Sequence, residues 1–492
     1  MKVLFVFVSC YTIPCWSPAI QALSSVLKAH GHETSLVYVG EGFVPDKINT
    51  ILSEVKKQEP FDLIAFSCTS LEYGRVKQIA SAVKRRYTNI LVILGGTHST
   101  IKPDDLGESP FDAFCLGEGE EALLELVERL EKGENYYDVQ NFHFKTRLGQ
   151  IIKNHVRPFI KDLNILPFWD WEVIDTRKLL AMRKGWLGVT FSRGCPCNCS
   201  FCVNETLREI KGREGYTRRR SVANVIAELK FLVETYPATK VVNFEDDLLV
   251  QDWKWISDFG EQFKREIYEK TGIKYKIESR VDVFNERLAK ALSESGCQEV
   301  QFGVETANPG LLKILNKGTN QTQIINSFKL CDKYKMKTMA FLMFGIPTET
   351  EDTVLETLDL MVKVKAGLTI ANFYYPIRGT RLYNHCIEHG LFRKNASDYG
   401  DYRRDSILKL PTISHKKLVW YGRLWPWHLN AHMGLTAYAD AALKFHDVRA
   451  GGMKRSREII LKTDRKLDAI TRVLHYRFFG FKPNYTERVD SK

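Results

Sequence analysis

The sequence has few of the features that would place a protein in a membrane or outside the cell. No apolar run approaches the roughly 20 residues that a membrane-spanning helix needs. The apolar start, Met1 to Val8, carries one lysine and is soon followed by Pro14 and Pro18, which indicates a strand rather than a signal peptide. With eleven cysteines in 492 residues and no such signal, we expect a reducing, cytoplasmic environment.

Two motifs that would indicate other chemistry are also missing. No GxGxxG fingerprint is present, which argues against a bound NAD. Zinc sites of the usual kind draw two ligand pairs from separate parts of the chain, and beside the cysteines at 195–202 we identify no second CxxC or HxxxH pair. A structural zinc site is therefore not expected.

The composition is that of a large globular protein, with 44% hydrophobic and 26% charged residues. A chain of this length suggests two or three domains. The formal charge of +12 is uneven, because residues 449–492 hold twelve Lys/Arg and five Asp/Glu, or +7, and the preceding 448 residues hold only +5. Such a tail is suited to nucleic acid, anionic lipid or a phosphorylated substrate, or it forms a solvated helical face.

The first 140 residues alternate between apolar runs and amphipathic stretches. We expect strands at 3–8, 35–39, 63–67, 91–94 and 113–116, with helices at 18–30, 46–57, 72–86 and 119–131. This alternation predicts a doubly wound, Rossmann-like parallel sheet. Ligands of such sheets bind beyond the carboxyl ends of the strands.

The same alternation resumes after an aperiodic stretch at 141–183, which we interpret as a linker. Six strand-like runs are expected at 187–191, 240–244, 275–279, 299–304, 338–344 and 369–375, with helices between them. Six β/α units are two short of a closed eightfold barrel, whose active sites collect at the carboxyl ends of the strands. The predicted domains are thus 1–140, a partial barrel over 184–400 and a mainly helical region over 401–492.

Four cysteines fall within eight positions directly after the first of these barrel strands: Cys195, Cys197, Cys199 and Cys202. With the spacing CxxxCxxC, Cys195, Cys199 and Cys202 form a loop that can bind three corners of a four-iron four-sulfur cluster and leave one iron without a protein ligand. Cys197 lies inside the first gap and is an alternative ligand.

The CxxxCxxC spacing after the first strand of a β/α repeat, with Phe201 before the last cysteine, resembles the radical S-adenosylmethionine (SAM) enzymes. The resemblance implies that the amino and carboxylate groups of SAM chelate the open iron. One electron from the cluster would then split SAM into methionine and a 5′-deoxyadenosyl radical, which abstracts hydrogen from a substrate. An electron donor of the flavodoxin or ferredoxin type is implied as well.

The strand ends of the predicted barrel also resemble the SAM-contacting segments of that family. The resemblance implies that Glu245 and Asp246 bind the ammonium of SAM, Arg280 its carboxylate, Glu305 the ribose, and the backbone at Gly345 and Pro347 the adenine. For the acids at 245–247 the alternative is a solvated turn, and for Arg280 it is a surface salt bridge.

The N-terminal domain resembles the cobalamin-binding domain that precedes many radical SAM domains. The resemblance rests on residues that follow the predicted strands, which are implied to bind cobalamin: Ser67, Thr69, Gly95, Gly96, Thr97, His98, Gly117 and Glu118. The DxHxxG signature is absent after the first strand, so that loop is not expected to supply a histidine ligand to cobalt. For His98 we favour a hydrogen-bonding role. A Rossmann-like domain with an empty pocket is the alternative.

Together the resemblances imply a cobalamin-dependent radical SAM enzyme, and they favour a methyltransferase acting on an unactivated carbon of a small-molecule or lipid-like substrate. A cyclisation, oxidation or ring rearrangement with the same cofactors, or a non-catalytic cobalamin carrier, are the alternatives. No nucleic-acid-binding module is recognised, and none is expected as a partner. The aromatic and basic stretch at 420–428 is interpreted as core packing, with peripheral membrane contact as the alternative.

Overall fold

The computed structural model describes residues 1–9, 14–40, 43–44, 47–212, 214–393, 405–423, 425 and 429. They form two compact units, one of residues 1–275 with 376–385, and one of residues 276–375 with the described residues from 386 onward. No helix among the described residues is both long and apolar enough to cross a membrane. Most of the C-terminal region predicted at 401–492, including the basic tail, lies outside the described residues.

The first unit begins with a seven-stranded sheet in the order β2-β1-β3-β4-β5-β6-β7. Its first five strands run parallel, whereas β6 and β7 are antiparallel additions at one edge. The apolar run of β1 is buried on both faces, as expected for a central parallel strand. The bounds are β1 Lys2–Val8, β2 Glu33–Val39, β3 Leu63–Ser67, β4 Leu91–Gly95, β5 Ala113–Cys115, β6 Phe142–Lys145 and β7 Ile151–Lys153.

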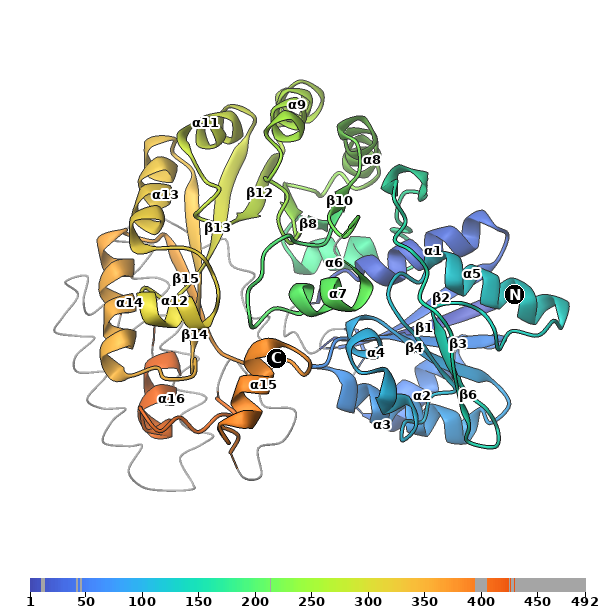
Figure 1. Cartoon of the computed structure of the whole chain (residues 1–492). Coiled ribbons are helices and arrows are strands. Elements are labelled where there is room, and N and C mark those ends of the chain that lie inside the picture. The colour runs from blue at the N-terminus through green and yellow to red at the C-terminus, as the bar shows by residue number, and fades with distance from the viewer. Residues whose placement is uncertain are drawn as a thin grey trace. The chain divides into compact units, whose positions relative to one another are not determined.

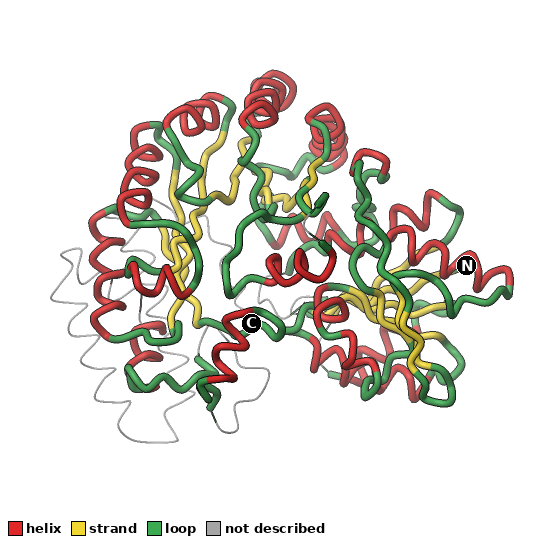
Figure 2. The backbone as a smooth tube through the Cα atoms, viewed as in Figure 1, coloured by secondary structure: helices red, strands yellow, loops and turns green. Residues whose placement is uncertain are grey.

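Helices cover both faces of this sheet (Figures 1 and 2). Side chains of α1 and α5 pack on one face around Phe5 and Ile93, and those of α2 and α3 pack on the other around Leu4 and Phe66. Helix α1 starts at Pro18, whose fixed φ and missing N–H suit a first helical position. The bounds are α1 Pro18–Ala29, α2 Ile48–Lys56, α3 Tyr73–Arg86, α4 Thr97–Ile101 and α5 Glu120–Lys132, with a 3₁₀ turn at Pro103–Leu106.

A connecting stretch and the first barrel strands complete this unit. In the connection, the indole of Trp171 packs against Trp16 of the N-terminal part and Trp169 against Phe191 of the barrel part, with ring centroids 6.4 Å apart in each pair. The elements are a 3₁₀ turn at Leu163–Ile165, α6 Thr176–Met182, β8 Trp186–Val189, β9 Ser192–Arg193, α7 Val203–Lys211, β10 Arg218–Arg219, α8 Val222–Thr235, β11 Val241–Phe244, α9 Trp253–Phe263, a π-helical turn at Lys264–Tyr268 and α10 Glu269–Thr271.

The barrel strands form one six-stranded sheet in the order β15-β14-β13-β12-β11-β8, which confirms the predicted partial barrel. In the second unit, α11, α13 and α14 line one side of the strands (Figure 1). Side-chain caps at Asn285, Asn320 and Thr350 mark the starts of these three helices. The bounds are β12 Lys274–Ser279, α11 Glu286–Glu294, β13 Cys297–Glu305, α12 Pro309–Ile314, α13 Gln321–Lys333, β14 Lys337–Phe344, α14 Glu351–Lys363, β15 Leu368–Phe373, α15 Arg381–Glu388 and α16 His415–Arg423.

The structure differs from the sequence-based expectation at two pairs of short antiparallel strands. Strands β6 and β7 fall in the stretch interpreted as a linker and extend the N-terminal sheet, and β9 pairs with β10 on either side of the cysteine loop. Strands of two to four residues contain too few positions to show a two-residue period, so the hydrophobic pattern does not reveal them.

Candidate functional site

A cavity of about 280 Å³ lies in the first unit at the carboxyl ends of β3, β4 and β5 and extends along the face of the sheet that α1 and α5 cover. Five of the residues predicted to bind cobalamin line it: Ser67, Gly95, Gly96, Gly117 and Glu118. The remaining wall is largely apolar and includes Phe5, Ala65 and Trp169. Bare glycine backbone beside an apolar wall fits a large, partly flat ligand such as cobalamin, of which a cavity of this size encloses only a part.

Gly96 has a backbone conformation that other residues rarely adopt. Its φ is +96°, and a Cβ atom there would lie 2.5 Å from the carbonyl oxygen of Cys68. The glycine therefore allows the turn from β4 into α4 to pass close to the end of β3.

His98 points into the fold and is not among the residues that line this cavity. Its ring stacks on Tyr73 with the centroids 3.6 Å apart, its Nδ1 lies 3.0 Å from Ser70 Oγ, and its Nε2 lies 3.3 Å from an Asp105 carboxylate oxygen. Burial lowers the pKa of His98 to about 3, so the ring is neutral. These contacts are typical of a residue that stabilises the surrounding loops and not of a ligand to cobalt.

Thr69 and Thr97 also lie outside the cavity lining. Thr69 donates from its hydroxyl and its backbone N–H to Glu72, at 2.5 and 3.0 Å, and so closes the turn before α3. Thr97 is the first residue of α4.

Glu118 contacts two arginines across the cavity wall. Its carboxylate lies 2.9 Å from both Arg193 and Arg218 and accepts a hydrogen bond from the Ile160 N–H, and Arg193 also pairs with Glu120 at 2.5 Å. Burial alone would raise the pKa of Glu118, but the two guanidinium groups hold it below its usual value. The network links the loop after β5 to β9, the strand that leads into the cysteine loop.

The cysteine loop runs from the end of β9 to the start of α7, where Cys202 is the N-cap residue. Cys199 is buried and the other three thiols are half-buried, and the Cys202 N–H donates to the Cys199 carbonyl at 3.1 Å. Phe201 is half-buried in this turn. Burial raises the pKa of Cys202 to about 11, and a side-chain hydrogen bond between Cys195 and Cys197, together with burial, raises that of Cys195. Thiols held so close together ionise readily only beside metal ions, which fits an iron–sulfur cluster.

The three acids after β11 have different surroundings. Glu245 pairs with Arg183 at 3.2 Å and accepts from Asn243 at 2.7 Å. Asp246 is 1% exposed and accepts from the backbone N–H groups of residues 191 and 192 at 2.9 and 2.6 Å, so it holds β9 in place, and burial raises its pKa to about 7.

Asp247 is the exposed member of the three and was not singled out from the sequence. It accepts from Asn204 of α7 at 2.9 Å, and its charge contributes to the raised pKa values of both Cys195 and Cys202. A run of three acids gives no signal for which carboxylate faces the cysteines.

In the second unit, Glu305 and Arg280 both make ion pairs. Glu305 ends β13 with a φ of +65° and lies 2.8 Å from Lys317 Nζ. Arg280 donates from two nitrogens to Asp282, at 2.9 and 2.8 Å, and from one of them to the Lys317 carbonyl at 2.5 Å. These contacts hold the largely buried guanidinium of Arg280 just after β12, and its binding of the SAM carboxylate stays a prediction.

The turn after β14 is organised by a buried carboxyl group. The Gly345 N–H donates to Glu349 at 2.5 Å, and the turn contains the buried Pro347. Glu349 is 1% exposed, and burial raises its pKa to about 8. No role was assigned to this glutamate from the sequence, because a polar residue in a turn carries no sign of burial.

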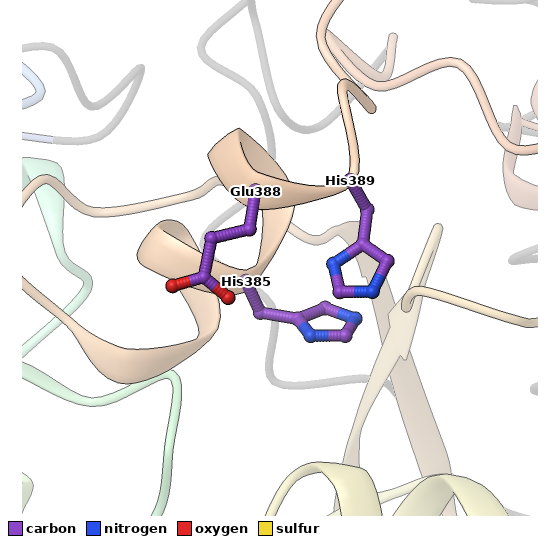
Figure 3. Close-up of side chains that lie close together, drawn as sticks. All are labelled: His385, Glu388 and His389. Carbon is purple, nitrogen blue, oxygen red and sulfur yellow. The ribbon is translucent and has the colours of Figure 1, made fainter.

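A separate group of ligand-type side chains lies at the end of α15 (Figure 3). His385, Glu388 and His389 place one ligand atom each within 4.8 Å of one another, and the latter two are exposed. The two histidines form an HxxxH pair, so the sequence-based statement that no such pair exists is wrong. The group contains no cysteine, and nothing beyond its spacing indicates a bound ion.

Comparisons with known proteins agree with this architecture. The family model of the B12 binding domain matches residues 6–127, and that of the radical SAM superfamily matches residues 189–361. The chain is 30% identical over 363 residues to the uncharacterized methyltransferase PH0819 of Pyrococcus horikoshii, covering 73% of this chain and 76% of that protein. It is 29% identical over 361 residues to the anaerobic magnesium-protoporphyrin IX monomethyl ester cyclase of Rubrivivax gelatinosus, covering 70% and 61%.

A solved structure shares the fold. The radical SAM methyltransferase TsrM of Kitasatospora setae, determined with cobalamin and a [4Fe-4S] cluster bound, superposes with a TM-score of 0.66 at 18% identity, over 79% of this chain and 75% of that one. The cysteine loop lies within the segment that the radical SAM model matches, and the cavity-lining residues Ser67, Gly95, Gly96, Gly117 and Glu118 lie within the segment that the B12 binding model matches.

Proposed function

Because the chain belongs to the radical SAM superfamily and carries a B12-binding domain, we propose that it methylates an unactivated carbon of a small-molecule or lipid-like substrate. It is an enzyme whose cofactors are a four-iron four-sulfur cluster, SAM and cobalamin. When bound, these cofactors supply a means of removing a hydrogen atom from the substrate and a methyl group to replace it. The proposal is supported most directly by the presence of the cysteine loop and the glycine-lined cavity in the same folded unit.

Three residues would bind the cluster: Cys195, Cys199 and Cys202. Their spacing supports this assignment, as does the turn that brings Cys199 and Cys202 together at the start of α7. Three thiolates leave one iron of a cubane available for SAM.

Two sets of residues would bind the organic cofactors. For cobalamin we propose the Ser67 hydroxyl and the backbone at Gly95, Gly96 and Gly117, with Glu118 holding the wall through its arginines. For the ammonium of SAM we propose Asp247, because its carboxylate is exposed beside the cysteines, whereas Asp246 is enclosed.

In the second unit, Glu305 and the turn at Gly345 and Pro347 are proposed for the ribose and adenine of SAM. The ion pair with Lys317 fixes the carboxylate of Glu305, and Glu349 fixes the turn. Residues held in this way need little reorganisation when a ligand binds.

Anaerobic reconstitution tests the proposal. With dithionite or a reduced flavodoxin or ferredoxin as electron donor, the full chain should release 5′-deoxyadenosine from SAM and transfer a labelled methyl group from SAM to a substrate. C199S and C202S should lose the cluster absorbance and this release. A wild-type chain that holds no cluster would contradict the proposal.

A second candidate is a cyclisation or oxidation with the same cofactors, favoured by the likeness to the magnesium-protoporphyrin cyclase. A cyclisation or oxidation would give a product without the labelled methyl group, although 5′-deoxyadenosine would still be formed. A non-catalytic cobalamin carrier would give neither.

A further inference from the structure

We propose that Arg208 determines which cysteines of the loop bind the cluster. By holding the backbone of residues 195–197 and the side chain of Asn198, it directs Cys195 and Cys199 to iron and keeps Cys197 from binding. The inference rests on the cluster ligands named under the proposed function and adds a positioning residue that acts on them.

Arg208 lies on α7 and donates to four successive residues of the loop. One guanidinium nitrogen donates to the carbonyl oxygens of Cys195, at 3.3 Å, and Pro196. The other donates to the Cys197 carbonyl, at 3.4 Å, and to the side-chain oxygen of Asn198. The planar fork of an arginine can bridge several acceptors in a fixed geometry, which a lysine cannot.

The contact between Arg208 and the loop is shielded from solvent. Arg208 is 6% exposed, and within the described residues the acceptors that its guanidinium contacts are four uncharged oxygens of this loop. A buried cation is thus stabilised by the loop that it holds. Because α7 starts directly after Cys202, the arginine joins the far end of the loop to the helix that follows its last cysteine.

A second arginine closes the same loop from α15. Arg381 donates to the Asn198 carbonyl at 2.8 Å and pairs with Glu205 at 2.7 Å. The neighbouring Leu382 N–H donates to the Ser200 carbonyl at 2.8 Å. Hydrogen bonds therefore hold residues 195–200 on both sides of Cys197, and they limit the rotation of that residue.

The loop needs such a constraint because it holds a competing thiol. Cys197 is two residues from both Cys195 and Cys199, and its thiol is hydrogen-bonded to that of Cys195. If the segment could rearrange, Cys197 could displace a neighbour or bind the fourth iron. A fourth thiolate would remove the open position that SAM requires.

The test compares R208Q, C197S and the double variant in the full chain after anaerobic reconstitution. The readout is the fraction of the reduced cluster whose electron paramagnetic resonance signal changes when SAM is added, with the cobalt(II) signal of cobalamin subtracted. Clusters are counted from this signal, because His385, Glu388 and His389 could bind additional iron. R208K, which keeps the charge without the fork, is the second arginine variant, and thermal melting shows which variants fold.

We expect C197S to respond to SAM as the wild type does, R208Q and R208K to lose more than half of the responsive fraction, and the double variant R208Q/C197S to regain it. Loss of the cluster in C197S alone, an unchanged response in both arginine variants, or failure of C197S to rescue a folded R208Q would each overturn the inference. Those results leave the proposed function intact, whereas a wild-type chain without a cluster would overturn both.

Discussion

Gly96 shows how one missing side chain shapes the cavity. We expect Gly96→Ala to destabilise the protein by about 3 kcal/mol, because the φ of +96° strains any other residue and the new Cβ meets the Cys68 carbonyl. Cobalamin affinity, measured by absorbance titration, should fall with it. Gly133→Ala is the matched control, since its φ is +68° but no atom lies within 4 Å of the added Cβ, and it should cost only about 1 kcal/mol. If chemical unfolding showed the same loss of stability for Gly96→Ala and Gly133→Ala, this account would be contradicted.

Glu349 gives a prediction about pH. Its pKa is about 8 in the folded protein and close to 4.5 in the unfolded chain, so between these values the folded state binds more protons. The free energy of unfolding should therefore decrease as pH rises from about 5 to 8, by a few kcal/mol at most. Glu349→Gln should remove this component, so its stability relative to wild type should be higher at pH 8 than at pH 6 in thermal melting. If the stability difference between Glu349→Gln and wild type does not vary with pH, the raised pKa of Glu349 is ruled out as a cause of the pH dependence.

At the scale of single residues, sequence and structure agree only in part. The glycines at 95, 96 and 117 were recognised because bare backbone at the ends of parallel strands is typical of close approach to a ligand, and they do line a cavity. Arg208, Glu349 and Asp247 were missed, because their roles depend on contacts formed after folding and no spacing in the chain reports them.

The antiparallel strand pair β9–β10 connects the cavity wall to the cysteine loop. Replacing Arg193 with methionine leaves Glu118 and Glu120 without a common partner, and removal of one side of such a largely buried pair should cost about 3 kcal/mol. We expect weaker cobalamin binding as well, since Glu118, next to Gly117, loses one of the two arginines that hold it.

Arg219→Met, in the paired strand, is the control for this change. Arg219 lies 3.9 Å from the half-exposed Asp252, so the same substitution should cost about 1 kcal/mol or less. If both variants had the same melting temperature and the same cobalamin affinity, the strand pair β9–β10 would not connect the cavity wall to the cysteine loop in the way described.

At the scale of elements, the hydrophobic pattern predicted the parallel strands and the longer helices, whereas the shorter helices α4, α6, α7, α12 and α15 were not predicted. The parallel strands and the helices between them lie within a few residues of their expected positions, because each extends over enough residues to show its period. The short strand pairs β6–β7 and β9–β10 were missed because each strand has too few residues to show a period, although the second pair organises the site.

For the molecule as a whole, the uneven charge gives a prediction that the sequence alone supports. A chain ending at residue 448 would carry +5 instead of +12. We expect the full chain to float with anionic vesicles at low salt and the shortened chain to remain in solution, because electrostatic attraction to anionic lipid scales with basic residues near the surface. Neutral vesicles are the control, and lack of binding by the full chain at low salt would remove the alternative of a peripheral contact with a membrane.

The return of residues 376–385 to the first unit has a consequence for synthesis of the protein. Arg381 lies 183 residues beyond Asn198, whose carbonyl it holds, so the ribosome makes the cysteine loop long before it makes the segment that closes it. Iron delivered to a growing chain would meet thiols whose backbone is still open on one side. Assembly of the metal centre should therefore favour completed polypeptides over nascent ones.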